Sequence, residues 1–227
     1  MLMFEAIRTA LVIAPHPDDE VLGVGGTMAR LAAADASVHV AIVTRAAEPM
    51  FGAEVQPMLE RESAAAHRCL GVKQTHHCGL PAAQLDQVPH SALNSCLVHL
   101  VETLRPDTVF VPFVGDLHLD HHLTFISSLV ACRPRTEFAP ARILAYETLS
   151  ETNWSAPGIT PAFNPNVFID VSETLDRKIE AFQHYASQVR EFPDERSPEV
   201  IRALATLRGA TVYKRAAEAF MLIRQTA

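Results

Sequence analysis

Short apolar runs alternate with helical patterns along the first 135 residues of the chain. Apolar runs that we expect to form buried strands lie at residues 11–14, 38–44, 76–80 and 108–112. Helical periodicity is found at residues 27–34, 57–70, 91–104 and 121–131. Strands that are apolar on both faces are typical of a parallel sheet covered by helices on each side. The pattern therefore predicts an α/β fold, Rossmann-like, with a mostly parallel central sheet and helices on both faces.

Beyond about residue 135 the order of the expected elements changes. Strands are expected at residues 142–147 and 167–171, and helices at residues 172–186 and 197–207. Ser172 and Ser197 are placed to be the N-caps of these two helices. The Leu, Ile and Ala residues of these C-terminal helices are expected to belong to the core. No repeat or low-complexity linker divides the chain, so we expect a single domain over residues 1–227.

Composition and charge narrow the class of protein. The chain has 227 residues, of which 48% are hydrophobic and 20% charged, as in an ordinary globular protein with a large core. The formal net charge is −7 without a cluster of Lys and Arg, which argues against nucleic acid as a partner. No apolar run reaches the roughly 18 residues of a membrane-spanning helix, and the N-terminal segment lacks the features of a signal peptide. We therefore expect a cytoplasmic protein with no transmembrane segment.

The cysteines are expected to be reduced. The four of them, Cys69, Cys78, Cys96 and Cys132, form no CxxC pair. Pairs with that spacing are typical of redox and metal sites. In a cytosolic protein, other cysteines remain thiols and behave as small apolar side chains.

A polar cluster, His16-Pro17-Asp18-Asp19-Glu20, directly follows the first expected strand. In open α/β sheets, ligands bind at the carboxyl ends of the strands. Histidine and aspartate are ordinary zinc ligands, so His16 and Asp19 could converge on one divalent cation. Asp18 could then act as general base toward a metal-bound water. The alternative is that the carboxylates only complement the dipole of the following helix, which does not require His16.

The glycines that follow this cluster suggest a nucleotide-binding loop only weakly. Gly23 and Gly25 begin a GxGxxG pattern, but Met28 occupies its sixth position. The preceding carboxylates would also repel a pyrophosphate. We expect the glycines to let the chain turn and the helix pack closely on the sheet.

A second polar cluster, residues 116–122 (DLHLDHH), follows the apolar strand at residues 108–112. Two strand ends would thus bring His and Asp side chains to one edge of the sheet, as a three-ligand metal site requires. His118 and His121 are one helical turn apart, so one could bind metal while the other faces the substrate. Asp120 could orient either histidine. A plain helix N-cap would explain one aspartate but not three histidines in five positions.

Together, His-Pro-Asp-Asp-Glu and the later His-x-Asp-His resemble the signature of the PIG-L/LmbE-type zinc-dependent de-N-acetylases. The resemblance covers nearly the whole chain. Supporting segments are Glu60–Gly71, Lys178–Gln188, Arg208-Gly209 and Ala217–Phe220. Members of this family remove acetyl groups from N-acetylglucosaminyl conjugates. The resemblance therefore implies an LmbE-like fold and a metal-dependent amide hydrolase whose small-molecule substrate is an N-acetylated amino sugar.

The resemblance also implies a role for each residue of the two clusters. The zinc ligands are matched by His16, Asp19 and His121. Asp18 matches the general base that takes a proton from the water attacking the amide. His118 matches the residue that steadies the oxyanion or protonates the leaving amine, and Asp120 matches its orienting partner. Zn²⁺ is the implied cofactor, and His/Asp ligands would also accept iron, cobalt or manganese.

Two substrate contacts are expected outside these clusters. Arg61 is the best match to a substrate-binding arginine of some members, and Trp154 could stack on a sugar ring or only pack within its loop. Asp116 departs from the pattern, because some members have a tyrosine there that polarises the substrate carbonyl. The variable loops 51–55 and 153–164 would shape the sugar site. Trimers or hexamers are common in the family, so a homo-oligomer is expected.

Other functions are compatible with the same residues. A related amidase could act on a different amide-linked substrate. A catalytically silent sugar-binding homologue could share the fold, although a binding protein has no need of both Asp18 and His118. A structural metalloprotein is a further alternative. The sequence does not identify the sugar or its aglycone.

Overall fold

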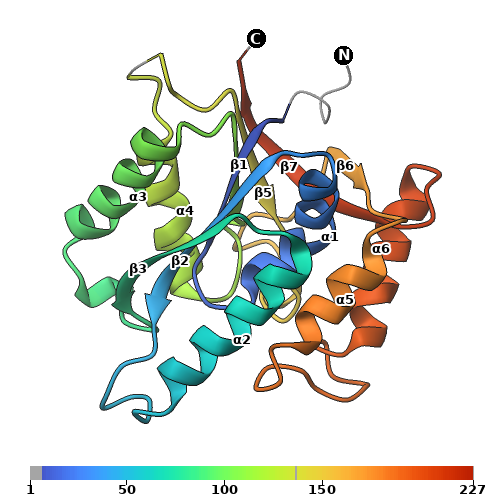
Figure 1. Ribbon diagram of the computed structural model, residues 1–227, viewed down its shortest axis with the longest axis horizontal. Helices are drawn as coiled ribbons and strands as arrows, with labels where there is room; N and C mark the ends of the chain where they lie inside the picture. Colours follow the sequence, from blue (N-terminus) through green and yellow to red (C-terminus); the bar gives the residue numbers. More distant parts are fainter. Residues whose placement is uncertain (1–6, 136, 227) are drawn as a thin grey trace.

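A seven-stranded sheet forms the centre of the fold in a computed structural model that describes residues 7–135 and 137–226 (Figure 1). The strands are β1 (Thr9–Ala14), β2 (Ser37–Arg45), β3 (Gln74–Pro81), β4 (Thr108–Pro112), β5 (Arg142–Tyr146), β6 (Val167–Asp170) and β7 (Ala217–Gln225). Their order across the sheet is β3-β2-β1-β4-β5-β7-β6. Neighbours from β3 to β5 are parallel, whereas β7 is antiparallel to both β5 and β6. The expected α/β fold with a mostly parallel sheet is confirmed.

Helices cover both faces of this sheet. They are α1 (Asp19–Ala33), α2 (Val55–Leu70), α3 (His90–Leu104), α4 (Leu119–Ala131), α5 (Leu175–Gln183) and α6 (Pro198–Thr211). One hydrophobic core contains buried residues of α1, α2, α5 and α6, and a second contains those of α3 and α4. Figure 1 shows the same division, with α3 and α4 on one side of the strands. Two short 3₁₀ helices, η2 (Leu85–Gln87) and η3 (Thr152–Trp154), lie in loops.

The inner strand β1 is apolar from Ala10 to Ala14, and the packing of its side chains explains this pattern. Ala10 and Val12 pack in the core beneath α1, whereas Leu11 and Ile13 pack in the core beneath α3 and α4. Because alternate side chains of a strand point to opposite faces, a strand with two covered faces has no polar positions.

The first helix begins eight residues earlier than residue 27, where the sequence pattern predicts it, at Asp19. The sequence pattern underestimates this helix because glycine weakens helix propensity. The structure shows what the glycines provide instead. A Cβ on Gly23 would overlap the ring of Tyr146, and one on Gly26 would lie 2.9 Å from Val171 Cβ. The expected close packing on the sheet is therefore present, although the chain turns before these glycines rather than at them.

The two expected N-caps have different outcomes. Ser197 caps α6, where its side chain accepts a hydrogen bond from the Val200 N–H. Ser172 does not cap α5, which begins at Leu175. Its hydroxyl instead donates to Asp170 Oδ1 at 2.6 Å, at the end of β6. A nearby carboxylate thus competes successfully for the serine.

Strand β7 is absent from the expected elements, since no element was expected over residues 217–225. It inserts between β5 and β6. Phe220 packs in one core and Met221 against the other, so the segment alternates between two covered faces. An apolar stretch of this kind has no polar face, and periodicity alone does not separate a buried strand from a buried helix.

The expectation of four reduced cysteines is wrong. Cys78 on β3 and Cys96 on α3 form a disulfide, with their Cα atoms 6.0 Å apart, while Cys69 and Cys132 are free thiols. Packing of α3 against β3 brings the pair together across 18 residues, a spacing without a sequence signature. Only Cys132 behaves as the buried filler that was expected.

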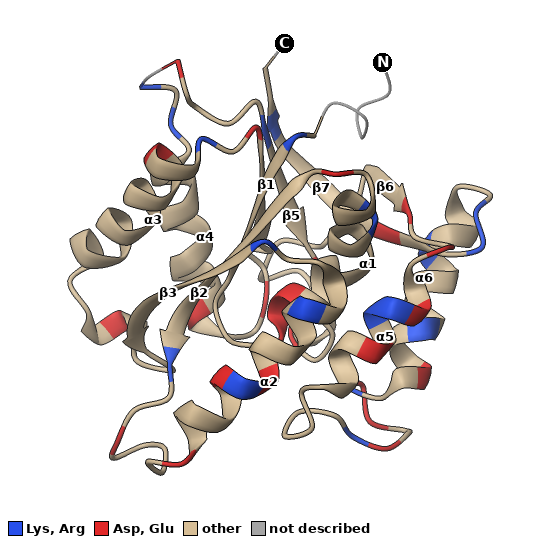
Figure 2. Ribbon diagram, viewed as in Figure 1, with Lys and Arg blue, Asp and Glu red and all other residues tan. Residues whose placement is uncertain are grey.

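Charged residues occur on many elements of the described chain (Figure 2). Figure 2 shows the Lys and Arg of the described residues scattered over several helices and loops. Within residues 7–135 and 137–226, no helix combines the length and the apolar character that crossing a bilayer requires. Residues 1–6, part of the segment on which the signal-peptide expectation depends, lie outside the described residues.

Candidate active site

The two polar clusters meet at the carboxyl ends of β1 and β4, which are parallel neighbours in the sheet. The first cluster forms the turn from β1 into α1, and the second forms the turn from β4 into α4. The ring centroids of His16 and His118 are 4.5 Å apart, and those of His16 and His121 are 5.4 Å apart. Residues about one hundred positions apart thus share one site, as the sequence predicts.

Three side chains are arranged to hold a metal ion. Asp19 Oδ2 lies 3.3 Å from His16 Nδ1 and 3.2 Å from His121 Nε2. Ligand atoms of the three residues lie within 4.8 Å of one another. Among the described residues, the buried His121 Nε2 has no hydrogen-bond partner, which is costly unless another species satisfies it. Two imidazole nitrogens and one carboxylate are a donor set that fits zinc.

A carboxylate supports each of the two histidines from behind. His16 Nε2 donates to Asp120 Oδ2 at 3.0 Å, and His121 Nδ1 donates to Asp116 Oδ2 at 2.8 Å. Each bond keeps a proton on the nitrogen that points away from Asp19, so the other nitrogen of each ring is the one turned toward Asp19. Carboxylate–histidine pairs of this kind orient metal ligands and raise their basicity.

These contacts correct the expected role of Asp120. The sequence predicts that Asp120 orients His118 or His121, but its carboxylate contacts the ring of His16. The carboxylate behind His121 belongs to Asp116, which the sequence pattern had marked only as a departure. The start of α4 turns the side chain of Asp120 toward the β1 turn, and Asp116 approaches His121 from the preceding loop.

Further hydrogen bonds hold the two supporting carboxylates. Thr152 Oγ1 donates to Asp116 Oδ1 at 2.6 Å. The Ala83 N–H donates to Asp120 Oδ2 at 2.7 Å. Loops after β3 and β5 therefore brace the histidines through the carboxylates, so the site is held by four strand ends rather than two.

His118 stands at the edge of the cavity and caps α4. Its Nδ1 accepts a hydrogen bond from the Asp120 N–H at 3.1 Å, so Nε2 carries the proton of the neutral ring. Burial, together with the charge on His16, lowers the pKa of His118 below its usual value. A single N–H donor thus remains for a molecule in the cavity.

Asp18 is buried and has a φ of 118°, a conformation that a non-glycine residue adopts at a cost of about 1–3 kcal/mol. Arg196 Nη1 donates to Asp18 Oδ2 at 2.8 Å. Burial raises the pKa of Asp18 to about 8, against the opposing charge of Arg196, and the charges of Asp19 and Glu20 add to the rise. A pKa shifted in this way is typical of groups that exchange protons in catalysis.

The other charges of the site are mutually compensated. Burial opposes the charge on His16, but hydrogen bonds to Asp120 and Asp19 outweigh it and raise its pKa to about 9. Burial would raise the pKa of Asp19, but the charge of His121 holds it well below the usual range. Asp19 is thus a carboxylate, as a metal ligand must be.

Glu20, the last residue of the first cluster, faces away from His16, Asp19 and His121, which together form the metal-type triad. Its Oε1 accepts hydrogen bonds from Tyr185 at 2.6 Å and from His67 Nε2 at 3.1 Å. Its Oε2 accepts the Asp18 N–H at 3.1 Å. Glu20 therefore braces the unusual backbone of Asp18 and joins it to α2 and the end of α5.

A cavity of about 210 Å³ opens beside these residues. Its lining includes His16, Asp18, His118, Glu151, Gln188 and Arg196 as polar residues, and Pro17, Ala46, Phe51, Leu59, Ala82 and Ala83 as apolar ones. The apolar part of the wall can thus pack against a bound molecule, while the polar part exchanges hydrogen bonds with it. Phe51 comes from the first expected variable loop.

The two expected substrate contacts lie elsewhere. Arg61 is exposed on α2 and does not line the cavity. Trp154 is 59% exposed, and its Nε1 donates to Glu195 at 2.8 Å. Arg196, which hydrogen-bonds Asp18 across 178 residues of chain, is not among the site residues that the sequence predicts. Nothing in the local pattern around Arg196 signals that contact.

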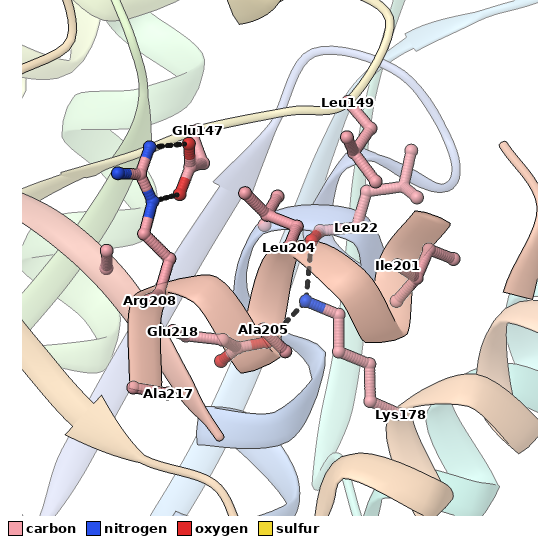
Figure 3. Close-up of a pocket in the computed structure, with 12 residues that line it drawn as sticks. Leu22, Glu147, Leu149, Lys178, Ile201, Leu204, Ala205, Arg208, Ala217 and Glu218 are labelled. Carbon is pink, nitrogen blue, oxygen red and sulfur yellow. Dashed lines mark hydrogen bonds and ion pairs between the residues drawn. The ribbon is translucent and has the colours of Figure 1, made fainter. Parts of the chain in front are cut away.

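A second, much smaller hollow lies between α1 and α6 and is shown in Figure 3. Lys178 Nζ donates to Leu22 O at 2.7 Å and pairs with Glu218 Oε1 at 2.6 Å. Glu218 in turn accepts the Gly26 N–H at 2.9 Å. The ion pair is thus also hydrogen-bonded to the backbone of α1 at both of its ends. Lys178 and Glu218 belong to the C-terminal segments that support the family resemblance. Because they bond to each other and to α1, we assign them a structural role.

Comparisons with known proteins show what this chain is similar to. The family described as GlcNAc-PI de-N-acetylase (PIG-L) matches residues 11–131, which hold both polar clusters. Diacetylchitobiose deacetylase of Thermococcus kodakarensis is 26% identical over 97% of this chain and 85% of its own length. The uncharacterized deacetylase YaiS of Escherichia coli is 31% identical over 72% of this chain and 82% of its own. The crystal structure of the conserved protein TT1542 from Thermus thermophilus superposes with a TM-score of 0.77, at 28% identity and 96% coverage of each chain.

Proposed function

Because the chain belongs to the GlcNAc-PI de-N-acetylase (PIG-L) family, we propose that it hydrolyses the acetamide of an N-acetylated amino sugar conjugate. Its relatives are deacetylases, that is, amide hydrolases that act on N-acetyl groups. One observation carries the proposal most directly. A metal-type triad with an unpartnered buried imidazole nitrogen stands beside a carboxyl and an N–H donor in one cavity.

In this proposal His16, Asp19 and His121 hold a divalent ion, for which zinc is the best match to the donor set. When bound, such an ion supplies Lewis-acid activation of a water molecule and of the amide carbonyl. The chain's own contribution at this point is rigidity. Asp120 and Asp116 keep the two imidazoles in the tautomers that present a lone pair to the ion.

Asp18 is the proposed general base. Its carboxylate lines the cavity and takes a proton from water as the water oxygen bonds to the carbonyl carbon of the acetamide. The C–N bond then breaks, and the nitrogen leaves as an amine after gaining a proton, so that acetate and a free amino sugar are formed. Asp18 is the local source of that proton, since it holds the one it took from water.

His118 is the proposed hydrogen-bond donor to the carbonyl oxygen of the acetamide. Its Nδ1 is occupied by the N-cap hydrogen bond of α4, so only Nε2–H is available to a molecule in the cavity. A fixed donor of this type stabilises the oxyanion that develops during attack, by about 3–4 kcal/mol in comparable sites. The mixed lining suits a sugar, whose ring has apolar faces and hydroxyl edges.

Residues 1–227 act as a single catalytic domain in a cytoplasmic homo-oligomer, a trimer or hexamer. Arg61 on α2 and Trp154 in η3 are proposed to contact the substrate.

Acetate release from a panel of N-acetylglucosaminyl compounds tests the function. We expect the zinc-loaded protein to release acetate from at least one compound. Asp18→Asn should keep its zinc and lose turnover by about 10²–10⁴-fold, whereas His121→Ala should lose zinc. Zinc-loaded protein that releases no acetate from any compound would favour a different amide substrate or a sugar-binding role. An Asp18→Asn variant with normal turnover would remove the assigned base.

A further inference from the structure

A guanidinium group is fixed against the carboxyl of Asp18 from the far side of the cavity. Arg196 lies in the loop between α5 and α6. Its Nη1 donates to Asp18 Oδ2 at 2.8 Å and to Gln188 Oε1 at 2.9 Å. Its Nε donates to Ser150 Oγ at 3.0 Å. Three separate loops thus converge on one side chain that lines the cavity.

The loop that carries Arg196 is itself tied down. The Arg196 N–H donates to Asp194 Oδ1 at 2.8 Å, and its carbonyl accepts the Arg190 N–H at 3.3 Å. One residue earlier, Glu195 accepts the Trp154 Nε1–H at 2.8 Å. The guanidinium is therefore held in place by its backbone and by its neighbours, independently of Asp18.

Of the three consecutive acidic residues 18–20, Asp18 is the one that takes its counter-charge from Arg196. Asp19 is compensated by His16 and His121, and Glu20 is hydrogen-bonded by Tyr185 and His67. Of the ion pairs among the described residues, the one to Arg196 is the only one that Asp18 makes. Removing one partner of such a buried pair leaves the other charge uncompensated.

The contact also leaves one oxygen of Asp18 open. Arg196 occupies Oδ2, whereas none of the hydrogen bonds among the described residues uses Oδ1. A carboxylate held at one oxygen by a planar, fixed donor presents its other oxygen in a defined direction. Lysine would provide only a point charge on a flexible stem and could not bridge Asp18 and Gln188 in the same way.

We propose that Arg196 is a positioning residue for the reaction: it holds Asp18 by Oδ2 so that Oδ1 faces the attacking water. This inference rests on the proposed function, in which Asp18 is the general base. Arg196 makes no contact with His16, Asp19 or His121 among the hydrogen bonds and ion pairs of the described residues. Its loss should therefore alter turnover and leave the metal in place.

Arg196→Ala and Arg196→Lys, each loaded with zinc, provide the test. We expect Arg196→Ala to lower kcat by about 10²-fold, the order of effect that misplacing a catalytic group produces, with a much smaller change in KM. Zinc content should equal that of the wild type. Guanidinium ion added to Arg196→Ala should restore part of kcat, and Arg196→Lys should fall between the two.

Arg208→Ala is the matched control. Arg208 also holds a carboxylate in a partly buried pair, with Glu147, but it lies at the hollow between α1 and α6. It should keep the wild-type kcat at a temperature below its Tm and show no response to guanidinium. An equal loss of kcat in both alanine variants, without rescue, would mean that only stability is affected and would overturn the inference.

A double-mutant cycle gives an independent readout. In the Asp18→Asn background, Arg196→Ala should have little further effect on kcat, because both act through one carboxylate. Full additivity, wild-type turnover in Arg196→Ala, or loss of its zinc would each overturn the inference while leaving the deacetylase function intact. A wild-type protein that releases no acetate would instead overturn the proposed function, and the role of Arg196 would fall with it.

Discussion

His121 Nδ1 and Asp116 Oδ2 lie 2.8 Å apart, in a pair that is completely buried. The contact explains the orientation of the imidazole, whose other nitrogen faces Asp19. It also explains why the position two residues before His118 holds an aspartate. A tyrosine would place its hydroxyl farther from the backbone and could not act as a carboxylate behind His121. The chain therefore uses this position to support the metal-type site.

Asp116→Asn tests that support. The substitution keeps the shape of the side chain but removes the charge that holds the Nδ1–H tautomer of His121. Changes of this kind typically cost about 10–100-fold in metal affinity, and we expect the same for zinc, measured by competition with a chelator. Asp107→Asn is a suitable control, because Asp107 accepts the N–H groups of Arg8 and Thr9 at the opposite end of the sheet. Equal zinc affinity in Asp116→Asn and the wild type would contradict the role of Asp116.

The Lys178–Glu218 pair should make a large contribution to stability. Both side chains are at most 5% exposed, and Lys178 Nζ also donates to the backbone oxygen of Leu22 in α1 (Figure 3). Lys178→Met leaves Glu218 buried without its counter-charge, which should lower the free energy of unfolding by about 3–5 kcal/mol. Urea unfolding of the variant measures this loss.

An exposed pair on neighbouring helices is the control for that measurement. Arg202 and Asp176 form an ion pair whose side chains are 53% and 86% exposed. Arg202→Met should change the free energy of unfolding by no more than about 1 kcal/mol. If both variants lose the same amount, burial is not what makes the Lys178 pair important.

Two histidines on the neighbouring strands β2 and β3 should make the protein less stable in acid. His39 Nδ1 on β2 lies 3.2 Å from His76 Nε2 on β3. Burial lowers the pKa of both, with His76 and Lys73 adding to the effect on His39 and His77 to that on His76. The unfolded chain therefore binds more protons below the usual histidine pKa of about 6.5. Stability rises with pH in that window and is lost as pH falls through it.

His76→Gln tests this pH dependence. The variant should lose less of its free energy of unfolding than the wild type between about pH 7.5 and about pH 5.5, because one of the two shifted groups is gone. His90→Gln, a substitution at an exposed position at the start of α3, should leave the wild-type slope unchanged. The same slope in His76→Gln and the wild type would show that the pair does not carry the effect.

The cysteines should react in a defined order. Cys132 is 3% exposed, and burial raises the pKa of its thiol to about 12. Iodoacetamide should therefore label Cys69 in the folded protein and reach Cys132 only after unfolding. Cys78 and Cys96 should be labelled only after reduction, because they are joined in a disulfide. Peptide mass analysis would contradict this assignment if either were labelled without a reductant.

Local sequence patterns account for most of the fold and for the centre of the site. Continuous apolar runs indicate strands with two covered faces, and β1 and β4 are such strands. Because ligands of parallel sheets gather at the carboxyl ends of strands, the clusters that begin at His16 and Asp116 could be placed on one edge in advance. Residue type alone also indicates which side chains suit a metal.

Tertiary structure decided the contacts between these elements. Arg196 reaches Asp18 across 178 residues because the α5–α6 loop folds over the sheet edge. Likewise, α3 packs on β3 and brings Cys78 to Cys96. Periodicity depends on neighbours along the chain, so it predicts elements and their buried faces. Which carboxylate stands behind which histidine depends instead on the packing of loops, for which a single sequence holds no local signal.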